Sequence, residues 1–181
     1  MKNFYKKSQS GRSMVEMLGV LAIIGVLSVG GIAGYSKAMQ KHKINKALEQ
    51  ISLIIAQVNT TFSGKGNYDG LTAYSAEIIK AAIGNEAAAA DNSLYRGGFT
   101  LQGSGRSFSL ELAGLGQEAC IAITTANWGD SASGISEINV RGGNYGYAEY
   151  SRASLPVSLV ATKEGCKCVQ SDCRITWYFD N

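Results

Sequence analysis

The longest apolar stretch of the sequence runs from residue 17 to residue 36 and contains no charged side chain. At about 1.5 Å per residue, a helix of this length covers about 30 Å, which is the thickness of the hydrocarbon core of a bilayer. Basic side chains precede the stretch at Lys2, Lys6, Lys7 and Arg12, and they favour a cytoplasmic N-terminal end, although lysines also follow it closely. The pattern predicts a single membrane-spanning helix.

The apolar pattern continues beyond this stretch, but on one side of the chain only. Apolar residues then recur at steps of four and three, which places them on one face of a helix. These residues are Ile44, Leu48, Ile51, Ile55, Val58 and Phe62. A secretory signal has a shorter apolar core followed by a cleavage site, and it does not continue into an amphipathic helix. We therefore predict one helix from about Arg12 to about Thr61, apolar all round in its first half and amphipathic in its second.

The sequence after Phe62 changes to short segments separated by glycine-rich loops. The loop at 63–70 ends the long helix. The segments that follow are one or two short helices in 74–90 with a break at Gly84-Asn85, two hairpin strands at 99–102 and 106–112, and strands at 135–140, 157–161 and 174–179. Residues 116–127 fit a short helix or a strand, and the glutamine, glutamate and alanine at their start favour the helix.

Together these segments predict an α+β fold. A long N-terminal α-helix, half transmembrane and half amphipathic, packs on a C-terminal antiparallel β-sheet head that contains disulfides. The stripe from Ile44 to Phe62 is the natural cover for the free face of the sheet. The 22 glycines and the single proline, Pro156, suit a turn-rich sheet better than a helical bundle.

Four cysteines, Cys120, Cys166, Cys168 and Cys173, lie in the last third of the chain and predict disulfides in an oxidising compartment. A zinc site is disfavoured because the Cys-Lys-Cys spacing is too tight and His42 lies far away in the sequence. A bridge from Cys120 to Cys166 or Cys168 would close a loop of about 45 residues and stabilise the fold by about 3 to 4 kcal/mol. A Cys166–Cys168 bridge is the least favoured, because one residue separates the two, and the pairing otherwise stays open.

Composition and charge narrow the range of functions. The chain is 45% hydrophobic and 17% charged, and its apolar content is concentrated near the N-terminus. The formal charge of +3 equals the charge of Lys2, Lys6 and Lys7, so the head has no basic excess that would indicate a nucleic-acid partner. The segment 103–106 lacks the Gly-Lys-Ser/Thr that completes a phosphate loop, and it fits a hairpin turn. No pattern of nucleophile and base indicates an enzyme, and no motif indicates a cofactor.

A short motif lies where the basic leader meets the apolar stretch. In Gly11-Arg12-Ser13-Met14-Val15-Glu16, a glycine follows the leader and a glutamate stands five residues beyond it. With Ala22-Ile23-Ile24-Gly25 and Tyr35, this region resembles the N-terminal cleavage and methylation segment of type IV pilins and pseudopilins, and it is similar to that of the type IVb kind. The resemblance covers about the first 35 to 50 residues of the sequence, whereas the head resembles pilins only weakly.

The resemblance implies a processed subunit that is stored in the membrane. A prepilin peptidase would cut between Gly11 and Arg12, and the inner-membrane pilus assembly machinery would then build the single-pass membrane subunits into a helical homo-oligomeric filament on the cell surface. The implied organisation is a leader at 1–11, a transmembrane and polymerisation half-helix at 12–36, an amphipathic half-helix at 37–62 and a pilin head at 63–181. The alternative function is a membrane-anchored extracellular binding module, or a minor pilin outside the filament body.

Glu16 has two interpretations. By the resemblance, its carboxylate neutralises the N-terminal amine on Arg12 of the next protomer and sets the axial register. Alternatively, Ser13 and Glu16 form a capping box at the start of the helix. The pilins that the chain resembles also carry a disulfide around the C-terminal region, which implies a bridge from Cys120 and a second, local pair through Cys173.

The chain departs from the family pattern at two places. Arg12 stands where a large apolar residue is usual, which brings a second positive charge beside the amine and puts N-methylation in question. Glycines replace the proline that relatives carry midway along the helix, at Gly30, Gly31 and Gly34. They predict either local flexibility or close helix packing through the Gly-x-x-x-Gly spacing of Gly30 and Gly34.

Overall fold

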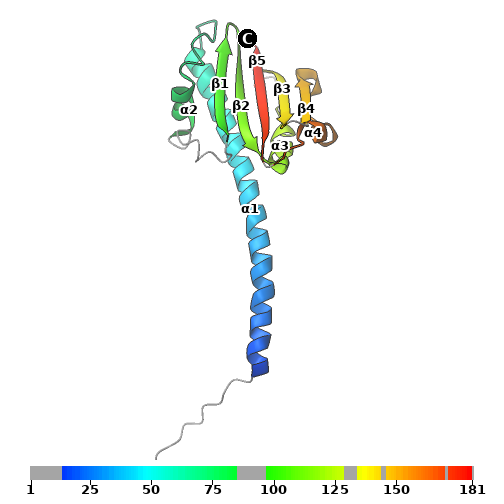
Figure 1. Ribbon diagram of the computed structural model, residues 1–181. Coiled ribbons are helices and arrows are strands. Elements are labelled where there is room, and N and C mark those ends of the chain that lie inside the picture. The colour runs from blue at the N-terminus through cyan, green and yellow to red at the C-terminus, as the bar shows by residue number, and fades with distance from the viewer. Residues whose placement is uncertain (1–13, 85–96, 129–133, 144–145, 170, 181) are drawn as a thin grey trace, which may run out of the picture. The chain divides into compact units, whose positions relative to one another are not determined.

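The computed structural model describes residues 14–84, 97–128, 134–143, 146–169 and 171–180. Figure 1 shows a long helix, α1, and a sheet accompanied by short helices. The chain divides into two compact units, residues Met1–Lys41 and His42–Asn181. The second unit, His42–Asn181, contains the sheet and is called the head from here on.

The helix α1 spans Met14–Phe62 and confirms the prediction of one long helix. In the part before His42, its described side chains are all exposed. In the head, α1 buries one face, formed by Ala47, Gln50, Ile51, Ile54, Val58 and Phe62. Ile51, Val58 and Phe62 belong to the predicted stripe, whereas its other members, Ile44, Leu48 and Ile55, are only partly buried. The buried face is therefore turned from the predicted one, with Ile54 at its centre.

One antiparallel sheet forms the second layer of the head. Its strands are β1 Gly98–Ser104, β2 Ser107–Leu115, β3 Ile135–Gly142, β4 Gly146–Ser151 and β5 Cys173–Asp180. They lie in the order β1-β2-β5-β3-β4, so β5 pairs with both β2 and β3 (Figure 1). The β1–β2 hairpin confirms the prediction, and its turn holds Gly105 at a φ of 56°, a left-handed value that glycine adopts without strain.

The two faces of the sheet have different chemistry. On the inner face, Leu110 and Leu112 of β2, Ile175 and Trp177 of β5 and Ile138 of β3 are fully buried. These side chains share one core with the buried face of α1 in the head. The alternate residues of the same strands form a polar outer face, as the period of two in a strand requires. The expected α+β fold, with the amphipathic helix covering an antiparallel sheet, is thereby confirmed.

Two of the short helices agree with the sequence. Helix α2, Ser75–Ile83, lies in the segment predicted to be helical and ends at Gly84. Helix α3, Gln117–Thr124, is the helix that was favoured over a strand. The remainder of the predicted 74–90 region, from Asn85 onward, lies outside the described residues.

The strand predicted at 157–161 is wrong. After a short 3-10 turn, η3 Arg152–Ser154, the chain forms helix α4, Leu159–Gly165. Ser158 starts this helix, because its Oγ accepts a hydrogen bond of 3.3 Å from the backbone N–H of Ala161. Leu159 and Val160 gave the segment its strand-like composition, but both are exposed.

Strand β4 has no counterpart in the prediction. Its buried positions are Gly146 and Tyr150, and its exposed or half-exposed positions include Tyr147 and Ala148. A glycine in an inward position and a tyrosine in an outward one mask the alternation of apolar and polar residues that identifies a strand.

Candidate assembly helix and disulfide-bonded segment

The first half of α1 presents an apolar surface that nothing in its own unit covers. Large side chains such as Leu18, Ile23, Leu27 and Ile32 are each more than half exposed. Among the described residues, α1 is the one helix long and apolar enough to cross a membrane. Water is a poor environment for so much apolar surface, so this half of the helix requires lipid or another protein chain around it.

Glu16 lies in the first described turn of α1 and is exposed. It is flanked along the chain by Val15 and Met17, and a carboxylate among apolar side chains needs a charged or hydrogen-bonding partner once water is removed. Its predicted neighbours at the cleavage site, Gly11 and Arg12, lie outside the described residues, as does Ser13 of the capping-box interpretation. Both interpretations of Glu16 remain predictions.

The glycines midway along α1 do not interrupt the helix. At Gly30, Gly31 and Gly34, an added Cβ would meet no atom within 4 Å, so no contact within the described chain requires a glycine there. Glycine costs roughly 1 kcal/mol relative to alanine inside an exposed helix. Local flexibility and close helix packing both remain predictions for these glycines.

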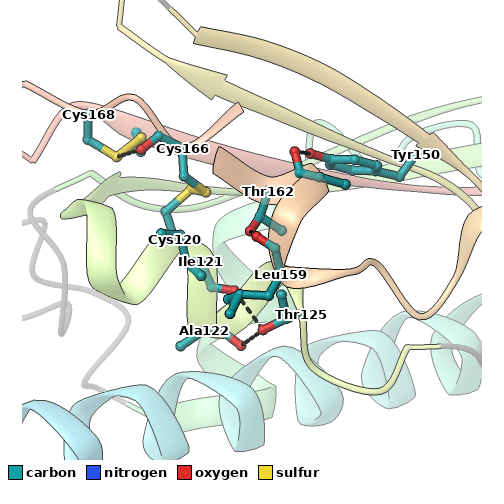
Figure 2. The surroundings of a disulfide bond; sticks show 11 residues. Cys120, Ile121, Ala122, Thr125, Tyr150, Leu159, Thr162, Cys166 and Cys168 are labelled. Atoms are coloured by element: carbon teal, nitrogen blue, oxygen red, sulfur yellow. Dashed lines mark hydrogen bonds between the residues drawn. A yellow bond between two sulfur atoms is a disulfide. The ribbon is translucent and has the colours of Figure 1, made fainter. Parts of the chain in front are cut away.

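Two disulfides join three elements at one end of the head. Cys120 of α3 is bonded to Cys166, the residue that follows α4, and Cys168 is bonded to Cys173, the first residue of β5. Figure 2 shows the first bridge between α3 and the segment after α4. The Cys120–Cys166 bridge has a sequence separation of 46, so it is expected to stabilise the head by about 4 kcal/mol through the loop that it closes.

The sulfur atoms of Cys120, Cys168 and Cys173 lie within 4.8 Å of one another. Metal binding by cysteine requires thiolates, and each of these sulfurs is already used in a disulfide. The residues present therefore do not fit a zinc ion in the oxidised protein. His42 is exposed on α1.

Three glycines bring the disulfide-bonded segment directly onto the sheet. A Cβ on Gly165 would lie 3.0 Å from the Cβ atoms of Val140 on β3 and Ala148 on β4. A Cβ on Gly142 or Gly146 would lie 2.7 Å from backbone oxygens at the end of α4. Real Cβ atoms do not approach other atoms as closely as 2.7 Å, so Gly142 and Gly146 are needed for this close approach, whereas a Cβ on Gly165 would require its neighbours to shift by a few tenths of an ångström. The role of these glycines in the close contact with the sheet is not apparent from the sequence.

Helix α4 is held to β4 by a partly buried hydrogen bond. The hydroxyl of Tyr150 donates to the backbone carbonyl of Ala161 at 2.9 Å (Figure 2). Burial raises the pKa of Tyr150 above its ordinary value of 10.0. The fold thus favours the neutral, donating form of this side chain.

Comparison with known proteins finds similarity to pilus subunits. The chain is 24% identical over 185 residues to the major structural subunit of bundle-forming pilus from Escherichia coli O127:H6 (strain E2348/69 / EPEC), and the match covers 96% of this chain and 95% of that protein. The corresponding subunit from Escherichia coli O111:H- is also 24% identical, over 186 residues. Over nearly its whole length, the chain is therefore similar to major structural subunits of a pilus.

Two further matches are less extensive. The toxin coregulated pilin of Vibrio cholerae is 32% identical over 63 residues, which cover 35% of this chain and 28% of that protein. A crystal structure of TcpA, a type IV pilin from the Vibrio cholerae El Tor biotype, superposes with a TM-score of 0.48 at 12% identity, covering 76% of this chain and 98% of that one. No family model matches the chain.

The outer face of the sheet carries a polar cluster. Arg174 on β5 lies 3.6 Å from the Glu111 carboxylate on β2, and Arg141 on β3 lies over the ring of Tyr147 on β4, 5.7 Å from its centre. Tyr147 donates a short hydrogen bond to Glu149, and this contact raises the pKa of Tyr147 above its ordinary value. Ion pairs on such an exposed surface contribute about 0 to 1 kcal/mol each.

Proposed function

We propose that this chain is a filament-forming type IV pilin. Its exposed apolar half-helix supports the proposal most directly, because a helix with such a surface needs a membrane before assembly and neighbouring helices afterwards. The proteins that match nearly the whole chain are named major structural subunits of a pilus, which favours a structural role over the anchored binding module. Such a subunit acts by forming contacts, and its role requires neither catalysis nor a cofactor.

Processing is the first step that the proposal includes. A prepilin peptidase cuts between Gly11 and Arg12, removes the leader at 1–11 and leaves the apolar half-helix at 12–36 as the mature N-terminus. The amphipathic half-helix at 37–62 and the globular region at 63–181 stay outside the membrane. Before assembly, the subunit is a single-pass protein of the inner membrane.

Assembly is the second step. The inner-membrane pilus assembly machinery transfers the subunits into a helical homo-oligomer that leaves the cell surface. Within it, the apolar half-helices lie against one another, and the carboxylate of Glu16 pairs with the amine on Arg12 of a neighbouring subunit. The pair offsets the cost of a charge removed from water, and it fixes the axial position of one subunit against the next.

The leader cut is tested by coexpression of the full chain with a prepilin peptidase, followed by mass spectrometry of the product. The expected product begins at Arg12, and it appears only when the peptidase is active. The variant Gly11→Val is the matched control and is expected to keep its leader, because a side chain then occupies the position before the cut. A product that still begins at Met1, or one cut beyond Tyr35, would contradict the proposal.

Filament formation needs a separate measurement. Cells that also contain the assembly machinery are sheared, and the released fraction is examined by electron microscopy and by gold-labelled antibody against the head. We expect filaments that carry the gold label along their whole length. Processed protein that stays entirely in the membrane fraction would instead support the anchored binding module.

A further inference from the structure

The two disulfides of the head are close enough to react with each other. The Sγ of Cys120 lies within 4.8 Å of both Cys168 Sγ and Cys173 Sγ, although its own bond is to Cys166. Thiol–disulfide exchange proceeds by attack of a thiolate on a disulfide sulfur, so it depends on such proximity and on access for the first thiol.

The four cysteines differ in access to solvent. Cys120, Cys166 and Cys173 are fully buried, whereas Cys168 is partly exposed. The segment that carries Cys168 is bounded by exposed residues, Lys167 and Val169. A reagent from solution therefore reaches the Cys168–Cys173 bridge before it reaches the Cys120–Cys166 bridge, and it attacks at Cys168.

We propose that the two disulfides form one exchange unit, in which reduction at Cys168 moves the bridge of α3 from Cys166 to Cys173. The partner is a dithiol, either a small molecule or a thiol–disulfide oxidoreductase. Because α3 then stays bonded to the C-terminal segment, the head loses one of its two disulfides but keeps its long-range cross-link.

The steps balance as follows. One thiolate of the dithiol attacks Cys168 Sγ, the Cys168–Cys173 bond breaks, and Cys173 leaves as a thiolate. The second thiol of the reagent then displaces Cys168, so the reagent is oxidised to a disulfide and the protein gains two electrons. The Cys173 thiolate attacks Cys120 Sγ, the Cys120–Cys166 bond breaks, and Cys166 leaves as a thiolate that takes up a proton. This last step transfers no net electrons.

The spacing of the cysteines permits the exchange and limits what the released thiols can do. The bridges Cys120–Cys166 and Cys120–Cys173 close loops of similar length, so loop entropy separates them little. The exchange leaves thiols on Cys166 and Cys168, and one intervening residue makes these two poor partners for each other. We therefore do not expect the two released thiols to form a disulfide with each other.

Limited reduction of the full-length protein in detergent tests the proposal. The protein is treated with one equivalent of dithiothreitol, quenched with acid, unfolded and alkylated, and its peptides are mapped by mass spectrometry. Most of the label is expected on Cys166 and Cys168, together with a cross-linked peptide pair that contains Cys120 and Cys173. Label on Cys168 and Cys173 with an intact Cys120–Cys166 bridge would overturn the proposal.

A variant gives a test that needs no reductant. In Cys166→Ser, Cys120 is expected to be bonded to Cys173, with Cys168 left as the thiol. A retained Cys168–Cys173 bridge beside a thiol on Cys120 would count against the exchange. Cys120→Ser is the matched control, because it lacks the exchange target, and limited reduction should then add label at Cys168 and Cys173 to the label already at Cys166. The wild-type measurement stands even where a variant folds poorly.

Discussion

Tyr150 connects two elements through a single hydroxyl, and its ionisation is coupled to folding. Burial favours its neutral form, so its pKa is raised in the folded protein. Below about pH 10, the ordinary pKa of tyrosine, the side chain is neutral in both the folded and the unfolded state, so its ionisation gives the free energy of unfolding no pH dependence. At higher pH the unfolded state ionises first, so the free energy of unfolding falls as the pH rises.

The variant Tyr150→Phe tests this coupling. It is expected to lose about 1 kcal/mol near neutral pH, because Ala161 loses its hydrogen bond, and to show a flatter decrease in Tm than the wild type between pH 9.5 and 11, values chosen around the ordinary pKa of about 10. Thermal unfolding followed by circular dichroism measures both effects. Tyr147→Phe, at an exposed position, is the control and should change neutral stability little. Equal slopes for wild type and Tyr150→Phe would show that Tyr150 is not the coupled group.

Ser158 stabilises the start of helix α4 in the segment 157–161, which the sequence predicts to be a strand. Its hydroxyl caps α4, and replacement of such a cap by alanine typically costs about 0.5 to 2 kcal/mol. Ser158→Ala is therefore expected to lower the free energy of unfolding by about 1 kcal/mol in urea denaturation. Ser158→Asp, which keeps an acceptor, should restore most of the loss. If the alanine and aspartate variants have the same free energy of unfolding, the hydrogen bond from Ser158 is not what stabilises the helix.

At the scale of elements, the contact between α4 and the sheet depends on Gly165. A side chain here would press against Val140 and Ala148, so the helix would have to move away from β3 and β4. Gly165→Ala is expected to destabilise the head by about 1 to 3 kcal/mol. Glu164→Ala, one residue earlier and exposed, is the control and should cost less than about 1 kcal/mol. Equal unfolding midpoints for the two variants would contradict the close contact.

The elements with long, regular patterns were predictable from the sequence. The helix α1 follows from an apolar stretch and a stripe that continue over many turns, and the β1–β2 hairpin follows from alternation on both sides of a glycine turn. The predicted buried face of α1 is rotated relative to the observed one. Steps of three and four residues fit several neighbouring faces of a helix, and the contact with the sheet determines which of them is buried. That selection buried Ile54, which the predicted stripe omitted.

The remaining features depend on contacts between distant segments. The glycines at 142, 146 and 165 are ordinary in the sequence, and only the close approach of α4 to the sheet gives them a role. The partner of Cys120 was open because Cys166 and Cys168 are neighbours, and the fold decides between them. The sequence also predicts leader cleavage between Gly11 and Arg12 and pairing of Glu16 with a neighbouring subunit. Both predictions concern contacts with other proteins, and the structure of one chain does not test them.

At the scale of the whole molecule, Glu16 provides the assembly prediction. Glu16→Ala is expected to leave leader removal intact, because the cut lies five residues away, and to lower incorporation into filaments about tenfold or more beside wild-type subunits. A tenfold loss corresponds to about 1.4 kcal/mol, which is close to the lower end of what a hydrogen bond to a charged group contributes. Mass spectrometry of purified filaments distinguishes the wild-type subunit from the Glu16→Ala subunit and measures the share of each.

The matched control for that experiment is Glu49→Ala, which removes an exposed acid from the head part of the same helix. It should be incorporated like the wild type. If Glu16→Ala is also incorporated normally, the carboxylate serves only as a helix cap, and the register pairing is wrong.

The position of β5 has a consequence for biosynthesis. It follows the other strands in the chain, yet it lies between β2 and β3 and provides the hydrogen bonds that join the two hairpins. A ribosome therefore delivers both hairpins before the strand that unites them, and an isolated hairpin is at best marginally stable. The nascent head should stay unfolded until β5 has emerged, and an unfolded chain is the form that can be threaded through a translocation channel.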